Sequence, residues 1–136
     1  MKIVLDTNVL VSAFAARGLC ADLFRHVIAE HELLVPEVVL TELERILTHR
    51  LGVPRETVAE IQQLLRGQTV IPRPAHHLAL GLRDPDDEWV VASAASGGSE
   101  ALVTGDKDIL EEKPVMPMPV YSPREFWEVQ RGSGRK

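Results

Sequence analysis

Residues 1–8 read Met1-Lys2-Ile3-Val4-Leu5-Asp6-Thr7-Asn8, and this stretch decides the fold class. Its consecutive aliphatic residues, without polar alternation, predict a short strand buried on both faces, as in parallel sheets. The strand ends at Asp6, and two small hydrogen-bonding side chains follow. Open α/β sheets bind ligands outside the carboxyl ends of their strands. The stretch therefore predicts a parallel strand that carries a carboxylate to the edge of a binding crevice.

Downstream, short aliphatic runs alternate with amphipathic helical patterns. Apolar residues spaced three and four apart predict helices, and short aliphatic runs bounded by turn residues predict strands. The predicted strands are residues 3–5, 33–35, 70–71, 101–104 and 120–121. The predicted helices are residues 9–16, 21–30, 37–50, 55–66, 85–96 and 123–129. This alternation favours the α/β class, with a parallel sheet covered by helices on both faces.

Two helix starts carry capping residues. Asp84 suits the N-cap of one helix, and Pro85 suits its first helical position. Ser122-Pro123-Arg124-Glu125 has the form of a capping box, in which the serine and glutamate side chains bond to each other's backbone amides. Between these helices, the proline-rich residues 114–119 predict extended backbone. We expect one domain over residues 1–130, followed by a basic, disordered tail at residues 131–136.

Composition bounds the class of protein. The chain has 136 residues and a net charge of −5, with 45% hydrophobic and 26% charged residues, as in ordinary soluble domains. No apolar run approaches the roughly 20 residues that a membrane span needs. We expect no secretory leader, because Met1-Lys2 is followed directly by the predicted strand, and the single Cys20 excludes an intramolecular disulfide. We therefore expect a cytoplasmic protein with no membrane association. The net negative charge argues against binding of nucleic acid, unless several of the carboxylates hold cations.

Four acidic residues are predicted to converge. Asp6 and Asp106 follow the first and fourth strands, so they meet at the same edge of a parallel sheet. Glu42 borders the apolar face of its helix, and Asp87 lies on the inward side of another helix's first turn. A buried carboxylate costs several kcal/mol unless it is paired or bound to metal. Hard oxygen ligands favour Mg²⁺ or Mn²⁺, which suit phosphodiester hydrolysis by an activated water.

Each of these residues also has a purely structural explanation. Asp6 is in a position to cap the following helix, and Glu42 is compatible with a solvated helix face. The negative charge of Asp87, in the first turn of its helix, interacts favourably with the helix dipole. Asp106 is also explained as a turn residue, and the same holds for Asp108. The site hypothesis fails only if the structural explanations for Asp6, Glu42, Asp87 and Asp106 all apply at once.

The chain resembles the PIN-domain ribonucleases in four pieces, which together span residue 1 to about residue 127. The pieces are Ile3-Val-Leu-Asp-Thr-Asn8, Val38-Val-Leu-Thr-Glu42-Leu, Asp87 ahead of Val90-Val-Ala-Ser-Ala94, and Leu102-Val-Thr-Gly-Asp106. Arg83-Asp-Pro-Asp-Asp87 and Val103-Thr-Gly-Asp-Lys-Asp108 are similar to a bacterial and archaeal branch of that family. This branch is grouped with the toxins of toxin–antitoxin pairs similar to VapBC.

The resemblance implies a three-layer α/β/α sandwich of Rossmann-like topology, with a parallel sheet of four to five strands. It also implies a Mg²⁺ or Mn²⁺ site, RNA as substrate, an antitoxin partner and a homodimer. The residues that match the catalytic, metal-holding positions are Asp6, Glu42, Asp87 and Asp106. The residues assigned as supporting polar positions are Thr7, Asn8, Thr104 and Asp108. Within the doublet Asp86-Asp87 we assign Asp87, because its spacing to the following apolar residues fits better.

Two other functions compete with this interpretation. A PIN-like module without turnover would bind RNA or a protein and leave the carboxylates catalytically silent. A receiver-like phospho-acceptor would need an acidic pair after the first strand and a lysine at the end of the last strand. Thr7-Asn8 and Tyr121-Ser122 stand there instead, which argues against the receiver.

Several basic residues near the carboxylates suit contacts with RNA phosphates or, equally, a solvated surface. They are Arg45, His49, Arg50 and Lys107. Trp89 is predicted on the opposite side of its helix from Asp87, where it packs under a loop or faces a partner.

Overall fold

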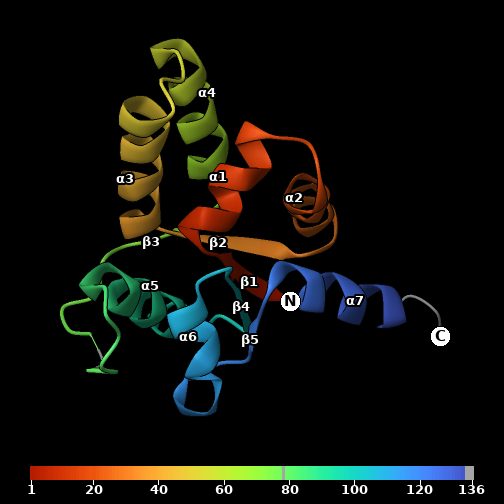
Figure 1. Cartoon of the computed structure of the whole chain (residues 1–136), viewed down its shortest axis with the longest axis vertical. Coiled ribbons are helices and arrows are strands. Elements are labelled where there is room, and N and C mark those ends of the chain that lie inside the picture. The colour runs from red at the N-terminus through yellow and green to blue at the C-terminus, as the bar shows by residue number, and fades with distance from the viewer. Residues whose placement is uncertain (78, 134–136) are drawn as a thin grey trace.

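The structure is a computed structural model that describes residues 1–77 and 79–133, coloured along the chain in Figure 1. Over these ranges five strands form one fully parallel sheet in the order β3-β2-β1-β4-β5. The strands are β1 (Lys2–Leu5), β2 (Glu32–Pro36), β3 (Thr69–Ile71), β4 (Ala101–Val103) and β5 (Val120–Tyr121). Each predicted strand is present, with its ends within one residue of the prediction.

Helices cover both faces of the sheet. Figure 1 shows α1 to α4 on one side and α5 with α6 on the other, while α7 packs against α2 and β5. The α-helices in the described ranges are α1 (Thr7–Ala15), α2 (Leu19–Glu30), α3 (Glu37–Arg45), α4 (Arg55–Arg66), α5 (Pro85–Ser96), α6 (Lys107–Glu111) and α7 (Pro123–Ser133). The architecture is the three-layer α/β/α sandwich that the sequence led us to expect.

The strand order creates a crevice at the carboxyl ends of β1 and β4. From β1 the chain proceeds outward to β2 and β3, and it then returns past β1 to β4 and β5. In β1, Val4 pairs with Leu34 of β2 on one side and with Leu102 of β4 on the other. Right-handed crossovers then place the helices after β1 and after β4 on opposite faces. Such a switch point is where open α/β sheets bind ligands.

The core is aliphatic, and β1 lies at its centre. Ile3, Val4 and Leu5 are each at most 1% exposed. Because helices cover both faces of β1, its consecutive aliphatic residues are all buried, which explains the lack of polar alternation. Phe126 of α7 is also fully buried, with its ring centroid 5.6 Å from that of Tyr121 in β5. This contact anchors the last helix to the edge of the sheet.

The helix predicted over residues 37–50 has the predicted extent but not a uniform hydrogen-bonding pattern. It is α-helical as α3 and continues as a π-helical turn, η1 (Ile46–Arg50). The backbone N–H of Leu51 donates to the carbonyl of Ile46, five residues earlier, at 3.1 Å. Leu47 stays buried through the change. The apolar pattern therefore cannot distinguish the two helix types.

Two segments after β4 differ from the prediction. Asp106 begins a short helix, α6, because its side chain accepts hydrogen bonds from the backbone N–H groups of Asp108 and Ile109. The turn-residue explanation for Asp106 was thus incomplete, since the turn continues into a helix. The proline-rich residues 114–119 are not extended throughout, because Lys113–Val115 form a 3-10 turn, η2. Proline is tolerated in the first turn of a helix, where its missing N–H has no partner to lose.

The last helix is longer than predicted. It runs from Pro123 to Ser133 rather than ending at Val129. The first part of the expected disordered tail, residues 131–133, is therefore helical, and residues 134–136 lie outside the described residues.

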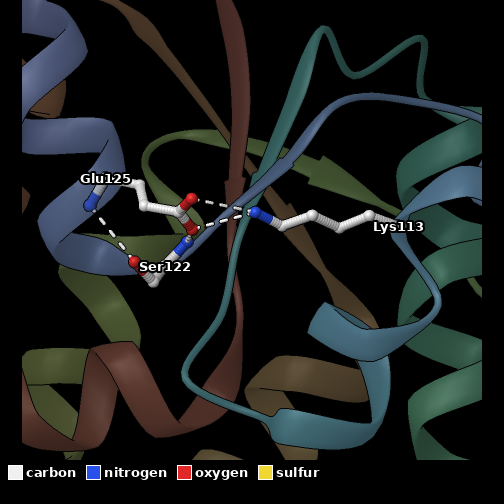
Figure 2. A network of polar contacts seen from close by, with 3 residues as sticks. All are labelled: Lys113, Ser122 and Glu125. Atoms are coloured by element: carbon white, nitrogen blue, oxygen red, sulfur yellow. Dashed lines mark hydrogen bonds and ion pairs between the residues drawn. The ribbon is translucent and has the colours of Figure 1, made fainter.

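The predicted capping box at the start of α7 is present and is joined by a lysine (Figure 2). The backbone N–H of Ser122 donates to Oε1 of Glu125 at 2.9 Å, and the backbone N–H of Glu125 donates to Oγ of Ser122 at 3.1 Å. Nζ of Lys113 lies 2.9 and 3.0 Å from the two carboxylate oxygens of Glu125. The Ser122 amide first, and then Lys113, lower the pKa of Glu125. These contacts tie η2 to α7.

Within the described ranges, no single helix is long and apolar enough to cross a membrane. Helices α1 and α2 would together be long and apolar enough for a span, but they are bent by 107° at the break between them. Apolar residues of both helices, such as Leu10 and Leu23, are buried in the core.

Candidate functional site

Asp6 is the buried centre of the site. It follows β1, caps α1 and is 4% exposed. Its Oδ1 accepts the backbone N–H of Thr7 at 2.8 Å, and its Oδ2 accepts the hydroxyl of Thr104 at 2.7 Å. Burial raises the pKa of Asp6 to about 6, against the lowering effect of both hydrogen bonds, and the charges of Glu42 and Asp106 raise it further. Since a tenfold change in proton affinity is worth about 1.4 kcal/mol, ionising Asp6 in the folded protein costs about 3 kcal/mol more than usual.

Thr104 joins the ends of β1 and β4 and positions Asp106. It is fully buried, and its hydroxyl oxygen accepts the backbone N–H of Asp106 at 3.0 Å. Oδ1 of Asp106 in turn accepts the backbone N–H of Asp108 at 2.8 Å, which caps α6. Asp106 is therefore both a helix cap and a charged neighbour of Asp6. For both Asp6 and Asp106, a role as helix cap is therefore compatible with a role in the functional site.

Asp87 brings a third carboxyl group to the site, from the first turn of α5. Its pKa is raised to about 8, first by burial, then by a side-chain hydrogen bond with Asp106, and then by the charges of Asp106, Asp6 and Asp84. Two carboxyl groups hydrogen-bond to each other only when they share a proton. The raised pKa therefore favours the protonated form of Asp87 at neutral pH, and in that form its carboxyl group can donate to Asp106. Asp86 of the same doublet is exposed.

Glu42 stands at the rim of the cluster. It projects from α3, and its side chain is 25% exposed. Its charge contributes to the raised pKa of Asp6, so the two carboxylates are electrostatic neighbours. Nη2 of Arg45, one turn along α3, lies 4.0 Å from Oε2 of Glu42. Glu42 is thus less buried than Asp6 at the centre of the site.

The predicted supporting residues contribute in different ways, some through side chains and some through the backbone. Thr104 supports Asp6 through its side chain, as expected. Thr7 supports it through the backbone N–H, while its own hydroxyl is buried with no hydrogen-bond partner in the described part of the chain. Oδ1 of Asn8 accepts the backbone N–H of Gly105 at 3.3 Å, and so holds the loop after β4 against α1.

Asp108 contacts the cluster through its backbone rather than through the side chain from which support was expected. Its Oδ1 lies 4.0 Å from Nε of Arg83, and its contact with the cluster runs through the backbone N–H that it donates to Asp106. At a helix start, the second or third residue after the cap donates its backbone N–H to the cap side chain. The unpredicted helix α6 therefore explains why the contact runs through the backbone of Asp108.

A pocket of about 240 Å³ opens beside the carboxylates, between α3, the loop after β3 and the start of α5. Its charged lining residues include Glu42 and Arg45 from α3, Arg73 from the loop and Asp86 from α5. The guanidinium carbon of Arg73 lies 3.9 Å from the centre of the Trp89 ring, so Trp89 packs under a loop, one of the two alternatives for it. Arg73 could not be found from sequence periodicity, because it lies in a loop.

The donor chemistry of the cluster fits a hard divalent cation. Asp6, Glu42, Asp87 and Asp106 offer carboxylate oxygens, and a cation would offset the burial and the mutual repulsion that raise the pKa values of Asp6 and Asp87. The partnerless hydroxyl of Thr7 adds a buried oxygen next to Asp6. Across the described residues, no three acidic, histidine or cysteine side chains are already grouped as metal ligands.

Similar proteins are consistent with this geometry. The sequence profile of the PIN domain family matches residues 2–108. Among solved structures, VapBC2 from Rickettsia felis, bound to a DNA fragment from its promoter, has 14% identity and a TM-score of 0.65, covering 90% of this chain and 98% of that one. VapBC-1 from nontypeable Haemophilus influenzae has 17% identity and a TM-score of 0.64, with 91% and 99% covered. FitAcB from Neisseria gonorrhoeae has 17% identity and a TM-score of 0.62, with 90% and 98% covered.

At these identities the structural likeness shows the fold. No match was found among curated protein sequences. The family profile, in contrast, covers most of the chain and includes all four carboxylates of the site, which are Asp6, Glu42, Asp87 and Asp106. The chain belongs to the PIN domain family.

Proposed function

We propose that this protein is a Mg²⁺- or Mn²⁺-dependent endoribonuclease that hydrolyses phosphodiester bonds of RNA. The observation that carries the proposal is the meeting of Asp6, Asp87 and Asp106 at the switch point of the sheet, where the pKa values of Asp6 and Asp87 are raised toward neutrality. Carboxyl groups gathered without a counter-charge destabilise a fold. A site that binds a divalent cation explains why they are gathered.

The protein's own contribution would be to hold oxygen ligands on rigid elements. Asp6 is fixed by the Thr7 amide and the Thr104 hydroxyl, and Asp106 is fixed as the cap of α6. Asp87 approaches from α5, and Glu42 closes the site from its rim. A divalent ion held there would lower the pKa of a bound water and offset charge on the phosphate oxygens. The rigid ligands would orient the water and the phosphate, which removes an entropic part of the barrier.

The test is cleavage of single-stranded RNA with Mg²⁺ or Mn²⁺, comparing wild type with Asp6→Asn and Asp87→Asn. We expect both variants to lose at least about 100-fold in rate, because each removes a ligand charge. Asp108→Asn is the matched control, because that side chain points toward Arg83, and it should cleave like wild type. Equal cleavage by all four proteins would refute the assignment.

We further propose that the protein is the toxin of a toxin–antitoxin pair, held inactive by an antitoxin protein and acting in the cytoplasm as a homodimer. The similarity to two structures named VapBC over nearly the whole chain supports this role. A neighbouring reading frame that encodes a small DNA-binding protein, and whose product forms a stable complex with this chain, would support it. Light scattering on the purified protein tests the dimer.

A catalytically silent RNA- or protein-binding module is the second candidate. The contact between Arg45 and Glu42 at 4.0 Å favours it, because a cation near a proposed ligand competes with metal. Calorimetric titration with Mn²⁺, beside the cleavage assay, separates the two functions. RNA binding without metal-dependent cleavage would favour the silent module.

A further inference from the structure

We propose that the pocket between α3 and α5 binds one nucleotide of a single-stranded RNA beside the scissile phosphate, with Arg45 and Arg73 holding its phosphates. This inference rests on the proposed ribonuclease function and names the subsite that positions the substrate. It assigns binding roles to Arg45, Arg73 and Trp89.

The pocket has the right place and size for this role. It shares Glu42 with the carboxylate cluster, and Asp86, another lining residue, directly precedes Asp87. A chain whose phosphate lies at the carboxylates therefore has its next nucleotide within reach of the pocket. The volume of about 240 Å³ accommodates one nucleotide unit, and Val38 and Val90 provide an apolar surface for a base.

Arg73 is a cation held in place for an incoming anion. Its guanidinium group stacks on Trp89 at 3.9 Å, and the Trp89 ring is in turn 4.6 Å from that of His77, edge to face. Arginine stacked on an aromatic ring keeps its hydrogen-bond donors directed outward and loses less freedom on binding a phosphate. Combined with a base-stacking surface, a fixed cation is the usual device for holding single strands.

Arg45 supplies the second cation from the other wall. Its side chain is 58% exposed, and its contact with Glu42 is at the 4.0 Å limit of an ion pair. An exposed pair of this kind is worth little and gives way to a better-placed anion. The acidic Glu37 in the same wall is engaged by Arg66, with Nη1 of Arg66 3.0 Å from Oε1 of Glu37. Its charge therefore opposes a bound phosphate less than its position suggests.

A second pocket indicates the path of the rest of the strand. This pocket, of about 460 Å³, lies between α3 and α4 and shares Thr41 and Arg45 with the first. It adds His49 and Arg55 to the basic lining, together with the acidic Glu44. Two adjoining pockets with apolar and basic lining residues, joined at Thr41 and Arg45, suit a single strand. A duplex, whose bases are stacked inside, would not fit the first pocket.

The experiment measures binding separately from cleavage. A fluorescent single-stranded RNA of 12 nucleotides and random sequence is titrated in Mn²⁺ with Asp6→Asn protein, which should not cleave it, and anisotropy gives the Kd. The same background carries Arg45→Ala, Arg73→Ala, Arg73→Lys or, as a matched control, Arg124→Ala, an exposed arginine of α7. A duplex of the same length is the second probe.

We expect Arg45→Ala and Arg73→Ala each to weaken single-strand binding at least about fivefold. Each should also reduce the slope of log Kd against log salt concentration by about one, as expected for the loss of one phosphate contact. The Kd of Arg73→Lys should lie between those of the parent and of Arg73→Ala, because lysine keeps the charge but cannot stack as a planar group on Trp89. Arg124→Ala should bind like its parent. In proteins with Asp6 intact, the two alanine variants should raise KM more than they lower kcat.

The proposal is overturned if both alanine variants bind the single strand within twofold of their parent. It is also overturned if they weaken single strand and duplex equally, or if they leave RNA binding intact but lose an antitoxin peptide. The last result would make the pocket a protein-docking site. Wild-type protein that binds the single strand through Arg45 and Arg73 but cleaves no RNA would refute the ribonuclease function and retain the subsite.

Discussion

The hydroxyl of Thr104 donates a 2.7 Å hydrogen bond to Oδ2 of Asp6, across 98 residues of sequence. The same hydroxyl oxygen accepts the backbone N–H of Asp106 at 3.0 Å. One buried side chain therefore fixes the orientation of two of the proposed ligands. The contact exists because β1 and β4 are neighbours in the sheet, although they are far apart in the chain.

Replacing this hydroxyl gives the first prediction. Thr104→Val keeps the shape of the side chain but leaves a carboxylate oxygen and a backbone N–H without their partner. We expect the free energy of unfolding to fall by about 1–3 kcal/mol. Thr104→Ser retains the hydroxyl, so its free energy of unfolding should fall by less. Urea denaturation measures both, and a Thr104→Val protein as stable as wild type would contradict the role of this bond.

The second prediction concerns Asp87 in metal-free protein. Its pKa is about 8 in the folded state, against an ordinary value of 3.8. The stability that its protonated form provides is therefore complete below about pH 4 and is lost as the pH rises through 8. Asp87→Asn has no proton to lose, so it should become progressively more stable than wild type between these limits. Thermal unfolding in EDTA at several pH values measures the difference, and an unchanging difference would argue against the raised pKa.

The third prediction concerns metal binding and pH. Protons compete with a cation for Asp6 and Asp87, whose pKa values are about 6 and about 8. Added Mg²⁺ or Mn²⁺ should therefore raise the Tm more at pH 8 than at pH 5. An ion at 100 times its Kd stabilises by about 2.7 kcal/mol. The Asp6→Asn protein is the control, and an equal rise of its Tm would place the ion elsewhere.

The fourth prediction tests the independence of α7 from the site. Ser122→Ala removes the side-chain half of the capping box but leaves the bond from the Ser122 amide to Glu125. We expect a loss of about 1 kcal/mol in stability, typical of a lost cap. RNA cleavage per folded molecule should be unchanged, because α7 packs against α2 and β5 rather than against the carboxylates. A large loss of cleavage with little loss of stability would link α7 to the site.

Local patterns in the sequence were sufficient for most of the fold. All five strands follow from short aliphatic runs, and the start of α5 at Pro85 and the capping box at Ser122 follow from residues next to each other in the chain. The convergence of Asp6 and Asp106 was also predictable, because parallel strands end at the same edge of a sheet. Helix α6 was missed because five residues are too few for a visible apolar period.

The sequence by itself determined the α/β class, the strands and the carboxylates that end two of them, because these depend on neighbours along the chain. Only the tertiary structure decided that the Thr104 hydroxyl bonds to Asp6, that the side chain of Asp108 turns to Arg83, and that Arg73 stacks on Trp89. These contacts join segments that become neighbours only after the sheet has formed. Side-chain direction, and with it the raised pKa values of Asp6 and Asp87, depends on burial in the assembled core.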